Sequence, residues 1–181
     1  MRFEPIRLLA LVPSAVSAMS FAGLSYRPSN KLVAIAEANG CTFPGRYHVK
    51  DFIGQSNSTG STAVLSSYNF TFEDAETNTT TFCQWNTSSV STTPSGLTPR
   101  FPCENHDIKF IWEDDKRELT PIERFCPNAD GKPTTEVSGS IAINLVWGEN
   151  QACAANSTDI EGRYYSIGPV IDPTFVKRGS A

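Results

Sequence analysis

The sequence has few of the residues that form metal sites or common catalytic motifs. It contains two histidines, His48 and His106, and its five cysteines include no Cys-x-x-Cys pair. That spacing does not fit a structural zinc site. A Gly-x-Ser-x-Gly nucleophile elbow and a glycine-rich phosphate loop are also missing from the sequence, which argues against an α/β-hydrolase and a nucleotide-binding protein. We therefore expect no metal and no cofactor.

The sequence also lacks a long hydrophobic run and a surplus of positive charge. Beyond the N-terminal region, no segment approaches the roughly 18 apolar residues that a membrane-spanning helix needs. The formal net charge is −4, whereas nucleic-acid binders usually show a basic surplus on one face. We expect neither a membrane span nor a nucleic-acid partner.

The first residues predict export from the cell. Two arginines precede a short apolar run at residues 8–12, and small residues follow at Val16-Ser17-Ala18. This order is typical of a signal peptide, here residues 1–18, with cleavage after Ala18 or after Ala22. The alternative is a short N-terminal helix of a cytosolic protein. Export predicts a secreted, extracellular product.

Five N-glycosylation sequons support export independently. Each has the form Asn-x-Ser/Thr, which is an acceptor for N-linked glycans in secreted proteins. The acceptor residues are Asn57, Asn69, Asn78, Asn86 and Asn156. Asn69 falls on the polar face of an expected strand and the other four fall in turn-like surroundings, where a glycan is tolerated.

Alternating apolar and polar residues predict an all-β fold. Tyr68, Phe70 and Phe72 alternate with polar residues, and the same period of two runs from Val137 to Trp147. The expected strands cover residues 45–52, 63–72, 79–85, 103–112, 117–124, 137–147 and 161–171. Seven short strands with polar turns favour a small antiparallel β-barrel or sandwich.

The same patterns divide the chain into segments. Residues 19–40 are expected to be a flexible arm or a short helix over residues 31–38, residues 41–172 the β-domain, and residues 173–181 a tail. Pro121 predicts an edge strand or a bulge, because proline cannot donate a hydrogen bond to a sheet. Residues 86–102 are expected to be an exposed, mobile loop, and residues 148–158 a loop that holds Cys153.

No group of residues forms a convincing catalytic site. His106-Asp107 lies close to Cys103, but that cysteine is better used in a disulfide. Acidic residues at 73–74, at 113–115 and at Glu118 could act as a glycosidase pair, although acidic residues at turns and strand ends usually only face water. The three tryptophans fall on strands, where core packing is more common than sugar binding. We expect no enzymatic activity.

The cysteines predict a domain that is cross-linked by disulfides. The chain has Cys41, Cys83, Cys103, Cys126 and Cys153. Two disulfides and one odd cysteine are the simplest arrangement after export, and an odd cysteine in a secreted protein forms an intermolecular bond or stays a free thiol. Cys83 and Cys103 bracket a polar loop between two expected strands.

Three segments resemble the Alt a 1-like family of small secreted fungal proteins, which includes a major mould allergen and plant-defence elicitors. The first is Cys41-x3-Gly45-x-Tyr47-x-Val49-x-Asp51-Phe52. The second is Tyr68-Asn69-Phe70-Thr71-Phe72 with a cysteine soon after it. The third starts at Cys103-Glu104-Asn105 and continues with Phe110-x-Trp112-x-Asp114-x-x-Arg117-x-Leu119. The resemblance covers residues 41–147.

The resemblance implies a pairing of the cysteines. Cys83 would pair with Cys103, Cys126 would take the second disulfide, and Cys41 would link two chains in a homodimer. The family's last cysteine precedes the final core strand, whereas Cys153 follows it here. We therefore expect a Cys126–Cys153 bond, with Cys41 as an intermolecular or free thiol.

The resemblance also implies a function. Such proteins act in the host apoplast as effectors or elicitors, by binding host plant defence proteins or small ligands. The expected partner-binding residues are Phe110, Trp112 and Arg117. The alternative is a secreted hydrolase or carbohydrate-binding protein that acts on cell-wall polymers.

Overall fold

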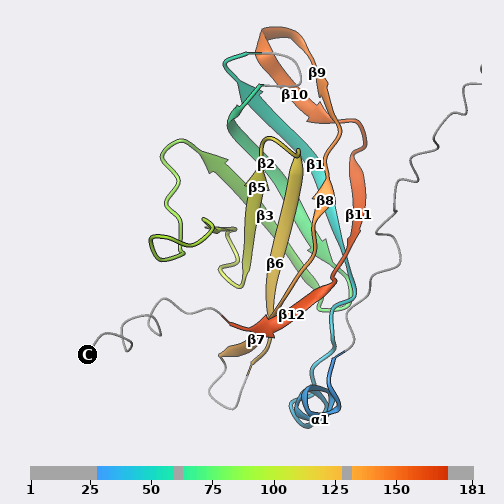
Figure 1. The fold of residues 1–181 in the computed structure, drawn as a ribbon. Coiled ribbons are helices and arrows are strands. Elements are labelled where there is room, and N and C mark those ends of the chain that lie inside the picture. The colour runs from blue at the N-terminus through green and yellow to red at the C-terminus, as the bar shows by residue number, and fades with distance from the viewer. Residues whose placement is uncertain (1–27, 59–62, 128–131, 171–181) are drawn as a thin grey trace, which may run out of the picture.

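The computed structural model describes residues 28–58, 63–127 and 132–170. The expected signal peptide at residues 1–18, its cleavage sites and the expected tail at residues 173–181 lie outside these ranges. Two antiparallel sheets, sheet A and sheet B, pack against each other in the described part. The α1 helix lies at one end of this sandwich and the β9–β10 hairpin at the other (Figure 1).

Sheet A has the strand order β3-β2-β1-β10-β9, and β11 also pairs with β1. Its strands are β1 (Arg46–Ser56), β2 (Leu65–Asp74), β3 (Thr79–Asn86), β9 (Leu145–Trp147), β10 (Ala152–Ala155) and β11 (Asp159–Arg163). A short 3-10 helix, η1 (Glu149–Gln151), joins β9 to β10.

Sheet B has the strand order β12-β7-β6-β5-β4, and β8 also pairs with β6. Its strands are β4 (Phe101–Pro102), β5 (Ile108–Glu113), β6 (Glu118–Pro127), β7 (Pro133–Ser138), β8 (Ile141–Ala142) and β12 (Ser166–Pro169). Together the sheets confirm the predicted all-β fold, in its sandwich form.

A bulge in β1 lets this strand pair with two partners along one edge. Residues 46–50 pair with β11 and residues 53–55 pair with β10. Between them Asp51 has a φ of 53°, a left-handed conformation that aspartate adopts more readily than most residues. Its N–H donates to the carbonyl of Thr158, 2.9 Å away, in the connection between the two partner strands.

The aromatic residues seen in the sequence fill the space between the sheets. Phe70 and Phe110 come from opposite sheets and meet edge to face, with ring centroids 5.2 Å apart. Phe52 and Trp112 form a second contact across the sandwich at 5.4 Å. Such pairs add about 0.5–1.5 kcal/mol beyond the area they bury, so the aromatic alternation of β2 and β5 fixes how the sheets face each other.

The α1 helix (Asn30–Ala38) confirms the short helix expected at residues 31–38. The Ser29 hydroxyl accepts a hydrogen bond from the N–H of Leu32, which caps the helix start. The helix ends at Asn39, and Gly40 takes the left-handed conformation with a φ of 64°. Ala36 is buried, so the helix contacts the core through one small side chain.

Residues 137–147 form three strands, not the single long strand predicted. Val137 lies in β7, Ile141 in β8 and Leu145 in β9, so the chain leaves sheet B and joins sheet A. The predicted strand at 161–171 is divided in the same way into β11 and β12, and the predicted loop at 148–158 contains β10. The apolar–polar alternation of residues 137–147 continues across the three strands because the apolar residues still face the core.

The two crossing segments pack directly against each other. A Cβ added to Gly139 would lie 2.0 Å from the carbonyl oxygen of Arg163, so only glycine fits there. The carbonyl of Gly139 accepts a hydrogen bond from the Tyr47 hydroxyl at 2.6 Å, and the N–H of Tyr165 donates to Ser138. The crossings are thereby fixed to each other and to β1.

Pro121 lies in a central strand, so the edge position, one of the two alternatives predicted for it, is wrong. β6 pairs with β5 along one side, where Pro121 faces Phe110. On its other side β8 pairs with β6 only up to Leu119 and β7 pairs only from Ile122. The proline stands in the gap between these two partners, where no strand requires its missing N–H.

The 86–102 segment is exposed at Val90 and Leu97, as predicted. It is also anchored to sheet B. Arg100 forms a 2.8 Å ion pair with Glu136 of β7, and both side chains are largely buried. The N–H of Thr92 donates to the carbonyl of Arg100 and closes the segment on itself.

Candidate ligand-binding hollow on sheet A

A row of side chains crosses the outer face of sheet A. Asn69 of β2 pairs with Ile53 of β1, Ile53 with Ala154 of β10, and Ala154 with Val146 of β9. Residues in register on neighbouring strands point to the same face. Ile53 is 50% exposed and Val146 is 58% exposed, so two large apolar side chains face solvent with a small alanine between them.

The small side chains leave a hollow at this place. In the next row Ser67, Gln55 and Ala152 are in register. The hollow has a volume of about 650 Å³, which lies within the range of small-molecule sites. Its lining is Ile53, Gly54, Gln55, Ser67, Tyr68, Asn69, Val146, Trp147, Gly148, Ala152, Cys153, Ala154, Ala155 and Asn156. No charged side chain is among these lining residues.

Cys153 borders the hollow from the core side. It is 4% exposed and has no disulfide partner among the described residues. A Cβ on Gly54 would lie 3.1 Å from its sulfur, so the glycine makes room for the thiol. Burial raises the pKa of the Cys153 thiol, against the opposing effect of the Arg117 charge. The thiol is therefore protonated and poorly nucleophilic.

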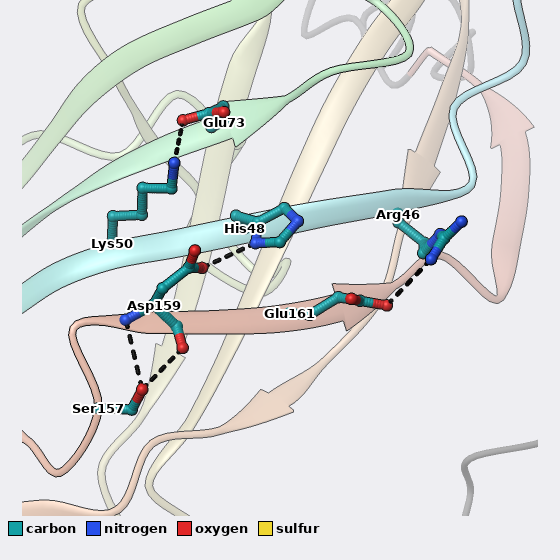
Figure 2. Close-up of polar contacts among 7 residues, drawn as sticks. All are labelled: Arg46, His48, Lys50, Glu73, Ser157, Asp159 and Glu161. Atoms are coloured by element: carbon teal, nitrogen blue, oxygen red, sulfur yellow. Dashed lines mark hydrogen bonds and ion pairs between the residues drawn. The ribbon is translucent and has the colours of Figure 1, made fainter.

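Three ion pairs lie on the same face of sheet A, at the end of β1 away from the hollow (Figure 2). Arg46, His48 and Lys50 of β1 bind Glu161, Asp159 and Glu73, at 3.6, 2.7 and 2.5 Å. All six side chains are at least one-third exposed. Exposed pairs of this kind contribute little to stability, so we regard them as the polar part of a solvent-facing surface.

The His48–Asp159 pair does not form a catalytic triad with the nearby serine. The Ser157 hydroxyl donates to the backbone carbonyl of Asp159 at 2.8 Å. Figure 2 shows the serine beside the aspartate backbone, away from the imidazole. A serine nucleophile must contact its base directly, so this arrangement does not support acyl transfer.

One predicted disulfide is confirmed and the other is wrong. Cys83 is bonded to Cys103, with Cα atoms 4.2 Å apart. Cys126 is bonded to Cys41, with Cα atoms 5.3 Å apart, so Cys41 is not the odd cysteine. Cys126 ends β6 near α1, whereas Cys153 lies in β10 at the far end of the sandwich (Figure 1). That separation excludes the predicted Cys126–Cys153 bond.

The predicted partner-binding residues are mostly inside the molecule. Phe110 is 0% exposed and packs on Phe70, so its assignment as a surface contact is wrong. Trp112 packs on Phe52 and Tyr68, with its ring N–H buried. Arg117 is held by Asp114 and the Ala63 carbonyl, and its guanidinium lies 6.0 Å from the centre of the Trp147 ring.

The other candidates from the sequence also have structural partners. Asp114 accepts from the N–H of Leu65, and Glu113 pairs with Lys116. Trp85 packs against Tyr68. Of the three tryptophans, Trp147 alone lines the hollow. His106 is exposed, and the neighbouring Cys103 is in a disulfide, so this pair has no thiol to activate.

Asp74 of β2, one of the acidic candidates from the sequence, is buried near Glu123 of β6, which sequence reasoning missed. Each is 1% exposed, and the two carboxyls are close enough for the charge of one to act on the other. Glu123 also accepts from Tyr164 at 2.6 Å and from Thr77 at 2.7 Å. Alternation along β6 could have indicated that Glu123 faces the core, since it is an even number of residues from Leu119 and from Phe125 and therefore points to the same face.

The carboxyl pair holds a proton at neutral pH. Burial raises the pKa of Glu123 to about 8 and also raises the pKa of Asp74. A protonated Glu123 can donate to Asp74, whose Oδ2 has no N–H or hydroxyl donor among the described residues. Both carboxyls are 1% exposed, so a sugar substrate cannot reach the position between them that it takes in a glycosidase.

Comparison with known proteins leaves the family open. No protein-family model, no curated protein and no solved structure matches this chain. In the described part of the chain, no helix has both the length and the apolar character to cross a bilayer. No group of three or more His, Cys, Asp or Glu side chains within that part is arranged to hold a metal ion.

Proposed function

We propose that this chain is a secreted, non-enzymatic binding protein that takes a small, neutral, mainly apolar ligand in the hollow of sheet A. The main observation in support is the row Asn69–Ile53–Ala154–Val146, in which two exposed apolar side chains lie on either side of an alanine. Two disulfides and five sequons support an extracellular place of action.

The lining indicates the chemistry of the ligand. Apolar walls with a few polar groups are typical of small-molecule sites. Gln55, Asn69 and Asn156 offer amide donors and acceptors that can orient a ligand. The absence of charge from the described lining favours a neutral compound over an anion or a cation. Trp147 is in register with Cys153 and borders the hollow from the core side, where it can serve as a fluorescent reporter.

The test is a titration with the neutral apolar dye N-phenyl-1-naphthylamine. We expect saturable binding to protein produced without N-glycans, seen as dye enhancement and tryptophan quenching. Ala154→Phe places a ring at the centre of the hollow and should weaken binding at least tenfold. Ala142→Phe is the matched control, because Ala142 is an exposed strand residue of the other sheet.

The controls distinguish dye binding in the hollow from nonspecific dye binding to the protein surface. Ala142→Phe should bind the dye as the wild type does. Trp147→Phe should keep dye binding and lose most of the quenching. Equal binding by wild type and Ala154→Phe, or no saturation in either, would contradict the proposed site.

We place the action of the protein in the host apoplast, as an effector or elicitor of plant defence. This part rests on the three segments that resemble Alt a 1-like proteins. Infiltration of leaves with purified wild type produced without N-glycans should alter the oxidative burst, and the Ala154→Phe variant made in the same way should not. Release of reducing sugar from cell-wall polysaccharide, or retention on chitin or cellulose, would favour the alternative of a wall-active hydrolase or carbohydrate-binding protein.

A further inference from the structure

The five sequon asparagines gather on one of the two sheets. Asn69 lies within β2, Asn86 ends β3 and Asn78 lies in the turn between them. Asn57 follows β1 and Asn156 follows β10. The strands of sheet B contain no sequon. The acceptors therefore lie on a strand, at strand ends and in turns of sheet A, and no strand of sheet B carries one.

Asn69 has the geometry of a glycan acceptor that faces the hollow. It stands in register with Ile53 on the outer face and lines the hollow itself. Its side-chain amide makes no hydrogen bond with the residues that the structure describes, so the nitrogen is free for a glycosidic bond.

The first sugars of an N-glycan match the hollow in chemistry and size. N-acetylglucosamine has an apolar C–H face and a methyl group, and its acetamido group can bond to amides such as Gln55. The volume of about 650 Å³ is that of a site for a small organic molecule. A chain attached at Asn69 begins at the wall of the hollow and needs no long reach to cover Ile53 and Ala154.

We propose that an N-glycan on Asn69 lies across the hollow and closes it, so that glycosylation at this one residue regulates ligand access. The effect on ligand access rests on the proposed function. The position of the glycan over the hollow does not. Chains that leave the secretory pathway with Asn69 unmodified are the binding-competent form. Chains glycosylated at Asn69 are closed.

The experiment uses the full chain secreted from a yeast that adds N-glycans, with Thr158→Ala in every protein, wild type included, because Asn156 also lines the hollow and carries a sequon. Thr71→Ala removes the sequon but keeps the Asn69 side chain in the lining. Thr80→Ala is the matched control, because it removes the sequon of Asn78, which lies in the β2–β3 turn and does not line the hollow. Glycopeptide mass spectrometry gives the occupancy of Asn69 in each preparation.

Two readouts follow. Hydroxyl-radical labelling of Ile53 and Val146 should be at least threefold lower in wild type and Thr80→Ala than in Thr71→Ala. Binding of N-phenyl-1-naphthylamine should be at least tenfold weaker in the first two than in Thr71→Ala.

The outcomes distinguish this inference from the proposed function. An unoccupied Asn69 in the secreted wild type, or equal labelling in all three proteins, overturns the glycan closure. Reduced labelling of the wild type with no dye binding by Thr71→Ala supports the closure and contradicts the proposed ligand site.

Discussion

Glu123 is the residue at which the stability of this protein should depend most on pH. Its pKa is raised from 4.5 to about 8 by burial, so between these values the folded state holds a proton that the unfolded state has lost. The free energy of unfolding should therefore be fully maintained below about pH 4.5, fall as the pH rises, and level off above about pH 8. One proton limits the slope to about 1.4 kcal/mol per pH unit.

The variant Glu123→Gln tests this dependence. Glutamine keeps a donor toward Asp74 at every pH, so its urea midpoint should change much less than that of the wild type between about pH 5 and pH 9, a range that brackets the raised pKa of about 8. Parallel pH profiles for the two proteins would show that the pair is not the titrating group.

Gly162 is the second residue at which a substitution should have a clear effect on stability. A Cβ there would lie 2.2 Å from the buried ring of Tyr47, its partner across the sheet. Gly162→Ala should destabilise the fold by at least about 1–3 kcal/mol, the cost typical of overpacking. Gly168→Ala is the control, since nothing lies within 4 Å of its added Cβ. Equal urea midpoints for both variants would contradict this close approach of ring and backbone.

At the scale of elements, the Cys41–Cys126 disulfide joins the segment after α1 to the end of β6. The bond closes a separation of 85 residues, and the double variant Cys41→Ala/Cys126→Ala should lose about 2–4 kcal/mol of stability. The segment around α1 should also become the first site of limited proteolysis. Cys83→Ala/Cys103→Ala should lower stability without exposing α1, and early cleavage near α1 in both variants would contradict the assignment.

Cys153 should be the only cysteine that reacts with an alkylating reagent in the unreduced chain. Because the thiol is buried and its pKa is raised, we expect labelling only after denaturation. Peptide mass spectrometry locates the label. Alkylation at Cys41, or a dimer that reduction separates, would restore the arrangement that the sequence resemblance predicts.

Local patterns predicted most of the elements. The aromatic alternation of β2 and the bracketing of a polar loop by Cys83 and Cys103 each depend on neighbours in the sequence. The division of residues 137–147 was not predictable in this way, because an inward-facing alternation looks the same whether its strand stays in one sheet or crosses to the other.

At the scale of the whole molecule, the candidate site could not be read from the sequence. The hollow depends on registers that bring Asn69 and Ile53 together with Ala154 and Val146, nearly the length of the domain away. The expected partner-binding residues were instead Phe110, Trp112 and Arg117. The long-range packing of the sandwich buries Phe110, packs Trp112 on Phe52 and holds Arg117 at Asp114. Glu123 was missed because burial, and not residue type, gives it its properties.

The divided edge of β1 has a consequence for how the chain is made. This strand leaves the ribosome early and pairs at once with β2, but the partners of its other edge, β10 and β11, lie at residues 152–163. Until those residues emerge, a long strand edge stays open in the nascent chain, and open edges recruit other strands. Biogenesis of this protein therefore depends on residues 152–163, and products that terminate before β10 should self-associate while the chain that includes β10 and β11 does not.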